Sequence, residues 1–174
     1  MDTLEVTTVV YLPREEVFDF LVDFPGYARY SKHLKNVVQD GDGGPGTRYA
    51  LRFAWWKLTY TARSEVTAVE RPERIEFRIL RDLDATGHWA VEPADVPADA
   101  PPDVETASRV RFAVEYDPTS VSAGSVDLPA FVNLSWVIDR VRPVVVREAE
   151  RVVERVVADL EGRERPVELT VERT

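Results

Sequence analysis

The sequence predicts an α+β fold in which a curved antiparallel sheet surrounds one long helix near the C-terminus. Two patterns predict this fold. Apolar residues recur at helical spacing from Phe131 to Leu160, and apolar and charged residues alternate with a period of two from Tyr49 to Tyr116. Since the apolar face of a sheet and the apolar stripe of a helix both need to be covered, we expect the two to face each other.

The first part of the chain predicts a strand, two short helices and a second strand. Pro13 suits the first turn of a helix, and Pro25 with Gly26 ends it. The expected elements are a strand over Leu4–Tyr11, rich in β-branched residues, a helix from Pro13 to Phe24, a helical turn over Tyr27–Tyr30 and a strand near Leu34–Val38. The segment Asp40–Gly46 is a turn by its glycine and aspartate content.

The middle of the chain predicts antiparallel strands with one apolar and one charged face. The apolar positions are Tyr49, Leu51 and Phe53; Leu58, Tyr60 and Ala62; Ile75, Phe77 and Ile79; Trp89 and Val91; and Val110, Phe112, Val114 and Tyr116. The proline-rich segment Pro93–Asp103 is expected to be a surface loop. Together with the earlier segments, we expect a sheet of about six or seven strands.

The long C-terminal helix is predicted by one apolar stripe with a charged face behind it. The stripe consists of Phe131, Leu134, Ile138, Val141, Val145, Ala149, Val152, Val156 and Leu160. Pro143 falls on the opposite side, where water can take the lost hydrogen bond, so we expect a bend rather than a break.

Residues 1–162 are expected to form a single domain, followed by a tail. Gly162 is a good helix terminator, and the tail comprises residues 163–174. Val167, Leu169 and Val171 alternate with polar residues, which fits an edge strand, whereas a chain terminus is more often frayed. The frayed end is the favoured of the two alternatives.

Composition excludes several classes of function. There is no cysteine, hence no disulfide framework, thiolate metal site or cysteine nucleophile. The net charge of −9 argues against nucleic acid as the main partner of this acidic protein. No apolar run reaches the ~18 residues of a spanning helix, and the N-terminus has no signal-like pattern, so we expect a cytoplasmic protein. Whether its scarcity of lysine reflects salt adaptation or codon usage stays open.

The sequence singles out no catalytic residue, metal site or cofactor. His33 and His88 are the only histidines, and no carboxylate cluster stands at ligand spacing. By alternation with Trp89, His88 points away from the apolar face, so a surface histidine is favoured over a general base. Trp136 lies opposite the stripe, where contact with a membrane, contact with a partner and cover by the tail are all open.

Three stretches, together with the final helix, resemble a known group of proteins. They are VVYLPREEVFDFLVDFPGYARY at 9–30, RFAWWKLTYTARSEV at 52–66 and LDATGHWAVEP at 83–93. In order and spacing they resemble the START-like superfamily, also called SRPBCC, and within it the coenzyme Q-binding and polyketide cyclase/dehydrase group. The likeness covers nearly the whole chain except the tail, although Val91 stands where the group has phenylalanine. It implies the helix-grip fold, in which a sheet curls around one long helix.

The resemblance also implies a cavity between sheet and helix, lined mostly by apolar residues with a few polar anchors. The expected wall residues are Tyr49, Leu51, Phe53, Tyr60, Phe77, Trp89, Phe112, Leu134, Ile138, Val141 and Val145, with Arg142 as a polar candidate. For Arg142, extension into solvent is favoured over ligand contact. We expect the cavity beside Phe131–Val145, because valine and alanine in the later part of the stripe can pack closely against the sheet.

The expected function is binding and sequestration or transport of an apolar small molecule, such as a polyprenyl quinone, a lipid or a polyketide-like ring system. One alternative is an enzyme of the polyketide cyclase/dehydrase type. A second is a protein-interaction module resembling the ribosome-associated toxins. A buried polar residue with a shifted pKa favours the enzyme, and a basic or apolar surface patch favours the module. Expected partners are the hydrophobic ligand and, transiently, a membrane, whereas no nucleic acid is expected.

Overall fold

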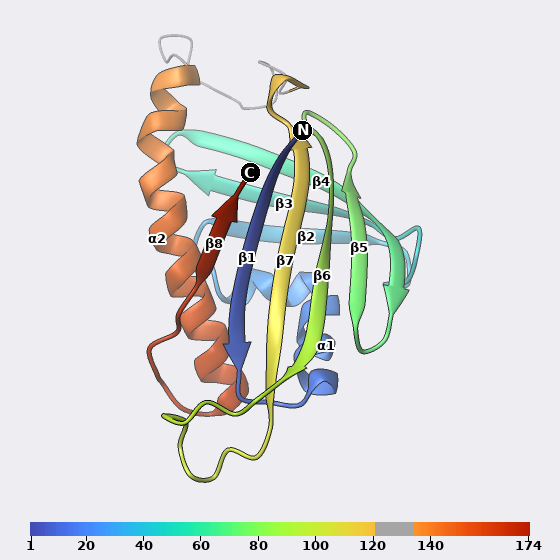
Figure 1. The fold of residues 1–174 in the computed structure, drawn as a ribbon. Coiled ribbons are helices and arrows are strands. Elements are labelled where there is room, and N and C mark those ends of the chain that lie inside the picture. The colour runs from blue at the N-terminus through green and yellow to red at the C-terminus, as the bar shows by residue number, and fades with distance from the viewer. Residues whose placement is uncertain (121–133) are drawn as a thin grey trace.

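The computed structural model describes residues 1–120 and 134–174, apart from the side chains of Leu134, Ser135, Val137, Ile138, Asp139, Val141 and Arg142. A curved antiparallel sheet and one long C-terminal helix form the frame of the molecule (Figure 1). The described elements, in chain order, are β1 (Asp2–Val10), α1 (Arg14–Val22), the 3-10 helix η1 (Phe24–Arg29), β2 (Leu34–Asp40), β3 (Arg48–Trp55), β4 (Leu58–Glu70), β5 (Arg74–Ile79), β6 (Asp84–Ala94), β7 (Ala107–Asp117), the 3-10 turn η2 (Pro118–Ser120), α2 (Leu134–Glu161) and β8 (Thr170–Arg173). The predicted α+β, helix-grip fold is confirmed.

The described sheet has eight strands in the order β2-β3-β4-β5-β6-β7-β1-β8, and the pairings given for them are antiparallel. In Figure 1 the strands β2, β3 and β4 run steeply across β1, β6 and β7, so the sheet curls into a trough. Register shifts between Leu34 and Asn36 and between Val66 and Ala68 mark irregular points in this curl, of the kind that bends a strand. The concave side of the trough faces α1, η1 and α2.

The main core lies where α1 and η1 pack into the lower part of the trough. Val17, Phe18 and Leu21 of α1 are buried against strand residues such as Ile75 and Val91. Val157 is the member of α2 in this cluster. The long helix is therefore anchored to the core near its C-terminal end.

The described members of the predicted α2 stripe do not all pack against other side chains. Val152, Val156 and Leu160 are half-buried, whereas Ala149 is exposed and Val145 is 55% exposed. The residue that packs most closely, Val157, lies beside the stripe and is 2% exposed. The expectation that valine and alanine in the later part of the stripe pack closely against the sheet was therefore wrong, because Ala149, Val152 and Val156 border a cavity there.

The helix passes through Pro143 without interruption. Pro143 is exposed, as predicted, so water can reach the carbonyl group that its missing N–H leaves unpaired. The bend expected at this position stays a prediction.

The C-terminal tail forms the edge strand β8, which was not among the six or seven strands expected. β8 pairs with β1 from Leu4 to Thr7, which corrects the preference for a frayed end. Arg165 provides the physical reason. Its guanidinium donates to both carboxylate oxygens of Glu161 and to the carbonyl of Val9, and it lies 3.8 Å from the centre of the Tyr11 ring. These contacts tie the tail to β1 before the strand begins.

Candidate functional site

A cavity of about 800 Å³ lies between α2, the concave face of the sheet and the short helices. Its wall consists of Thr8, Val10, Val17, Phe20, Leu21, Tyr27, Tyr30, Ser31, His33, Leu34, Leu51, Phe53, Ala54, Trp55, Leu58, Tyr60, Trp89, Val110, Val144, Val145, Val146, Glu148, Ala149, Val152, Val153, Val156, Val157, Leu160 and Arg173. Most of these side chains are apolar. Because Val145, Val146 and Ala149 are exposed as well as lining it, the cavity opens to solvent beside α2.

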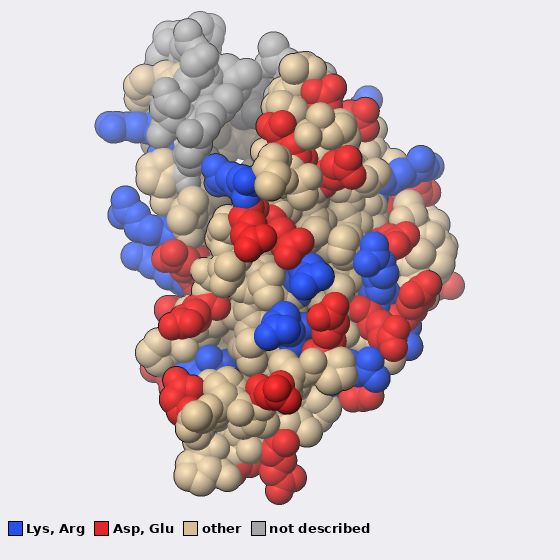
Figure 2. Space-filling model, viewed as in Figure 1, with Lys and Arg blue, Asp and Glu red and all other residues tan. Residues whose placement is uncertain are grey.

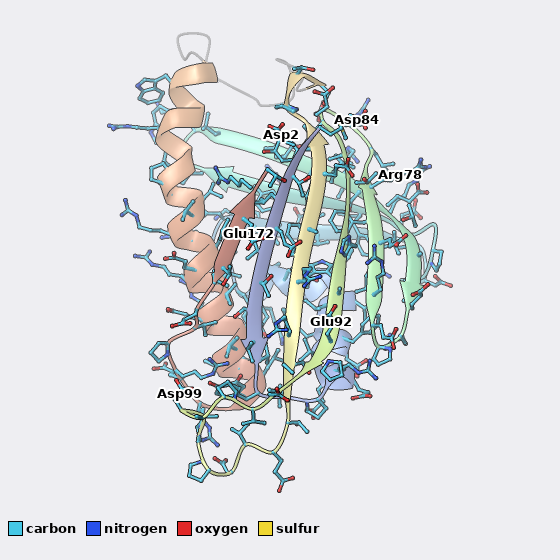
Figure 3. The ribbon with its side chains drawn as sticks, viewed as in Figure 1. Asp2, Arg78, Asp84, Glu92, Asp99 and Glu172 are labelled. Atoms are coloured by element: carbon cyan, nitrogen blue, oxygen red, sulfur yellow. The ribbon has the colours of Figure 1, made fainter. Side chains whose placement is uncertain are left out.

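Strand periodicity explains the aromatic wall opposite α2. Leu51 and Phe53 alternate on β3, and Phe53 pairs across the strands with Tyr60 of β4. Trp89 of β6 pairs with Phe112 of β7, and their ring centroids are 4.6 Å apart. Charged residues of the sheet point the other way, as Arg78 of β5 and Asp84 and Glu92 of β6 do on the outside of the sheet in Figure 3.

The structure brings part of the predicted wall together. Leu51, Phe53, Tyr60, Trp89 and Val145 line the cavity. The side chains of Leu134, Ile138, Val141 and Arg142 lie outside the described residues. The remaining three, Tyr49, Phe77 and Phe112, do not line it.

Local packing accounts for these three absences. Tyr49 is 2% exposed and packs into the core against Phe24, with ring centroids 4.6 Å apart. Phe77 pairs with Gly87, where an added Cβ would lie 2.6 Å from its ring, so the missing side chain makes room for that ring. Phe77 then stacks on Phe112 at 5.9 Å, and the pair supports the wall rather than forming it.

The cavity also extends further along α2 than predicted. Val152, Val156 and Leu160 line it, although the expected position was beside Phe131–Val145. The small stripe residues do not close onto the sheet, and an aromatic cluster from α1 and the η1 region forms one end of the space between them. Phe20 stacks on Tyr27 and contacts Tyr30 edge-on, with ring centroids 5.4 Å and 5.5 Å apart.

Glu148 is the charged residue of α2 that sequence reasoning missed. It is 8% exposed, lines the cavity and receives a hydrogen bond of 3.3 Å from Nη1 of Arg155. The same nitrogen donates to the carbonyl of Tyr30 at 2.7 Å. The Tyr30 hydroxyl donates to Asp159, so these contacts join η1 to α2. The sequence could have identified Glu148, because it lies at helical spacing from the stripe residues Val145 and Val152. This spacing places its carboxylate on the apolar side of the helix.

The tyrosines of the wall are neutral hydrogen-bonding groups. Burial, followed by the charge of Asp23 and the proximity of Tyr49, raises the pKa of Tyr27 well above its ordinary value. Burial and a smaller contribution from Asp82 raise the pKa of Tyr60. Burial and the hydrogen bond to Asp159 raise the pKa of Tyr30. Tyr27 already donates to the carbonyl of Leu21. These groups suit binding and orientation better than proton abstraction.

The two histidines lie in different places. His33 lines the cavity, and its Nδ1 is 3.3 Å from the carbonyl oxygen of Ala54. His88 is half-buried and does not line it. Burial lowers the pKa of His88, and the positive charge of Arg74 lowers it further. Among the described residues, no group of three or more His, Asp or Glu side chains is placed to hold a metal ion.

The chain was also compared with known proteins. Residues 1–163 match the family described as polyketide cyclase / dehydrase and lipid transport. No curated protein matches the sequence. No helix in the described part of the chain is long and apolar enough to cross a membrane.

Solved structures share the fold at low sequence identity. Ara h 8.0201 has a TM-score of 0.61 and 16% identity, over 92% of this chain and 98% of that one. The di-domain ARO/CYC StfQ from the steffimycin biosynthetic pathway has a TM-score of 0.56 and 13% identity, over 91% of this chain and 49% of that one. TTHA0849 from Thermus thermophilus has a TM-score of 0.53 and 17% identity, over 92% and 95%.

Proposed function

Because the chain belongs to the polyketide cyclase/dehydrase and lipid-transport family, we propose that it binds and carries one apolar small molecule in the cytoplasm. The observation that supports this proposal most is the open, apolar cavity of about 800 Å³. Its volume lies within the range usual for small-molecule sites. At ~25 cal/mol per Å² of apolar surface buried, an isoprenoid or acyl chain reaches micromolar affinity without a specific hydrogen bond.

The wall suits a ligand that is apolar over most of its length and polar at one place. Aromatic side chains of β3, β4 and β6 line one side, and valines of α2 line the other. Glu148 supplies a hydrogen-bond acceptor within this surface. This acceptor favours a polyprenyl quinol, a lipid with a hydroxyl group or a phenolic polyketide-like ring system, whereas a polyprenyl quinone fits the apolar wall alone. Transient contact with a membrane is the expected source of such ligands.

Titration with a short-chain quinone tests the proposal. Trp55 and Trp89 line the cavity, so a bound quinone should quench their fluorescence. Trp55→Phe and Trp89→Phe should reduce the quenching while leaving the affinity measured by calorimetry within about threefold, because phenylalanine keeps an apolar wall.

A cavity-filling variant sharpens that test. Val152 is half-buried and faces the cavity, so Val152→Trp should weaken quinone binding at least about tenfold by occupying the space. Glu154→Trp, on the exposed side of the same helix, is the matched control and should bind as the wild type does. Equal affinities in these two variants would show that the ligand binds elsewhere.

An enzyme of the cyclase/dehydrase type is the second candidate, favoured by one specific observation. Glu148 is a nearly buried carboxylate at the cavity wall. In this position it could accept a proton from a polyketide-like substrate bound in the cavity. Similarity of fold to the ARO/CYC StfQ points in the same direction. Turnover of a linear poly-β-keto substrate that disappears in Glu148→Gln would favour the enzyme over the carrier.

A further inference from the structure

The tip of the β3–β4 hairpin holds a tryptophan that the fold does not require. Trp55 pairs with Leu58, so Trp56 and Lys57 form a two-residue turn. Trp56 has a φ of +53°, in the left-handed region that glycine or asparagine usually occupies, and its side chain is 57% exposed. Neither core packing nor turn geometry accounts for a bulky aromatic residue here, which points to a role at the surface.

A second exposed tryptophan lies beside it. Trp136, in the first turn of α2, is 50% exposed, and its ring centroid is 6.4 Å from that of Trp56. Each ring also has a cation nearby, with Lys57 Nζ 5.6 Å from the centre of Trp56 and the Arg140 guanidinium 5.8 Å from the centre of Trp136. Single exposed apolar residues are common, whereas exposed apolar side chains that form a contiguous patch mark interaction sites. We call these four residues the tryptophan patch.

The charge around the tryptophan patch is opposite to that of the protein as a whole. Among the described side chains of residues 52–60 and 134–147, four are basic (Arg52, Lys57, Arg140 and Arg147) and none is acidic. The net charge of the whole chain is −9. In Figure 2 basic side chains gather along the upper, outer edge of α2, whereas acidic ones are spread widely over the rest of the face. The patch is therefore complementary to an anionic surface.

The tryptophan patch is continuous with the open side of the cavity. Trp55 lines the cavity, and its ring centroid is 6.4 Å from that of Trp56. Figure 1 shows the ends of β3 and β4 next to the first half of α2. On the same half of the helix, Val145 lines the cavity and is exposed. An apolar molecule leaving a membrane at this patch would have only a short path to the cavity.

We propose that the tryptophan patch docks the protein on anionic phospholipid surfaces. Tryptophan rings are stable at the level of lipid head groups, because one edge is polar and the rest is apolar. Lys57 and Arg140 would lie against lipid phosphates, where each basic residue near an anionic membrane adds binding energy. The route of the ligand rests on the proposed carrier function, but docking itself needs no ligand.

Vesicle flotation tests the docking. Wild-type protein should float with phosphatidylcholine vesicles that contain phosphatidylglycerol, float less with phosphatidylcholine alone, and lose binding as salt rises. The double variant Trp56→Asn and Trp136→Gln should bind at least about tenfold more weakly on both kinds of vesicle, since most of the inserted apolar area is gone. Asparagine adopts positive φ readily, so the hairpin is kept.

Charge variants and matched controls complete the test. Lys57→Glu with Arg140→Glu should weaken binding to the anionic vesicles by about fivefold or more for each residue. Val38→Asn and Arg151→Glu alter an exposed apolar and an exposed basic residue elsewhere and should bind as the wild type does. Wild-type protein that floats with neither kind of vesicle, or patch variants that float like the wild type, would overturn the docking.

Two further measurements separate the possible explanations. A concentration-dependent dimer that the same tryptophan variants abolish would assign the patch to a second copy of the chain and overturn membrane docking. The patch variants should bind quinone in solution as the wild type does, because the patch residues do not line the cavity. If wild-type protein floats but its cavity binds no quinone, phenol or monomeric lipid, the carrier function fails and the docking stands.

Discussion

At the scale of single residues, Glu148 places a carboxylate in the mostly apolar wall of the cavity, where it can select among ligands. A buried carboxylate is costly unless it is paired, and Arg155 supplies the partner while also donating to the carbonyl of Tyr30. The carboxylate is an acceptor that an otherwise apolar wall presents to whatever fills the cavity. A ligand with a hydroxyl group gains from this contact, and a ligand with only ether or carbonyl oxygens does not.

Glu148→Gln should therefore remove a preference rather than all binding. We expect the wild type to bind a long-chain alkylphenol about tenfold more tightly than its methyl ether, since hydrogen bonds to charged groups contribute about 1.5–3 kcal/mol. Glutamine can both donate and accept, so the variant should bind the two compounds within about threefold of each other, as calorimetry would show. Glu150→Gln, on the exposed side of α2, should keep the wild-type preference. An unchanged preference in Glu148→Gln would mean that the carboxylate does not contact the ligand.

At the scale of secondary-structure elements, α2 both packs in the core, near its C-terminal end, and lines the cavity over a longer part of its length. Val157 is 2% exposed and holds the helix in the core although it also borders the cavity, while Val145, Ala149 and Val152 line the cavity and are more exposed. A helix that packed tightly along its whole stripe would leave no cavity.

This division predicts an order of stability among three variants. Val157→Asp should cost about 3 kcal/mol or more of the free energy of unfolding, because it places a charge on a side chain that is 2% exposed and packs in the core cluster. Val152→Asp should cost less, since its carboxylate can reach water in the open cavity. Glu154→Ala, exposed to solvent, should change the free energy of unfolding by less than about 0.5 kcal/mol. Urea unfolding measures all three, and equal costs for the two aspartate variants would show that α2 packs through its stripe after all.

Periodicity predicted the elements well and their contacts less well. The period-two positions from Tyr49 to Tyr116 fall in β3 to β7, and the stripe from Leu134 to Leu160 lies in α2, whereas Phe131 lies outside the described residues. The distance between helix and sheet could not be predicted, because it depends on how strongly the strands curl and on which residues of α2 enter the core, and both are set by contacts between distant segments. The same limit applies to Phe77, whose place depends on the absent side chain of Gly87. The tail strand depends on Arg165, whose partners are distant in sequence.

At the scale of the whole molecule, the fold holds an open apolar surface in place without covering it. The sheet curls, α1 and η1 fill its lower part, and α2 spans the remaining gap between β8 and the β3–β4 hairpin (Figure 1). Apolar surface in contact with water is unfavourable, so occupation of the cavity should stabilise the folded chain. The proposed carrier function therefore requires that an apolar molecule occupies this cavity.

Mass spectrometry of an organic extract from freshly purified protein tests that claim most directly. We predict one chemically related set of apolar molecules at close to one per chain in the wild type, and at much lower amounts in Val152→Trp, whose side chain fills the cavity. Glu154→Trp should retain the wild-type amount. Equal amounts of the apolar molecules in all three proteins would show that they do not bind in the cavity. A wild type that is purified empty and also fails to bind added quinone, phenol or lipid would rule out the proposed carrier function.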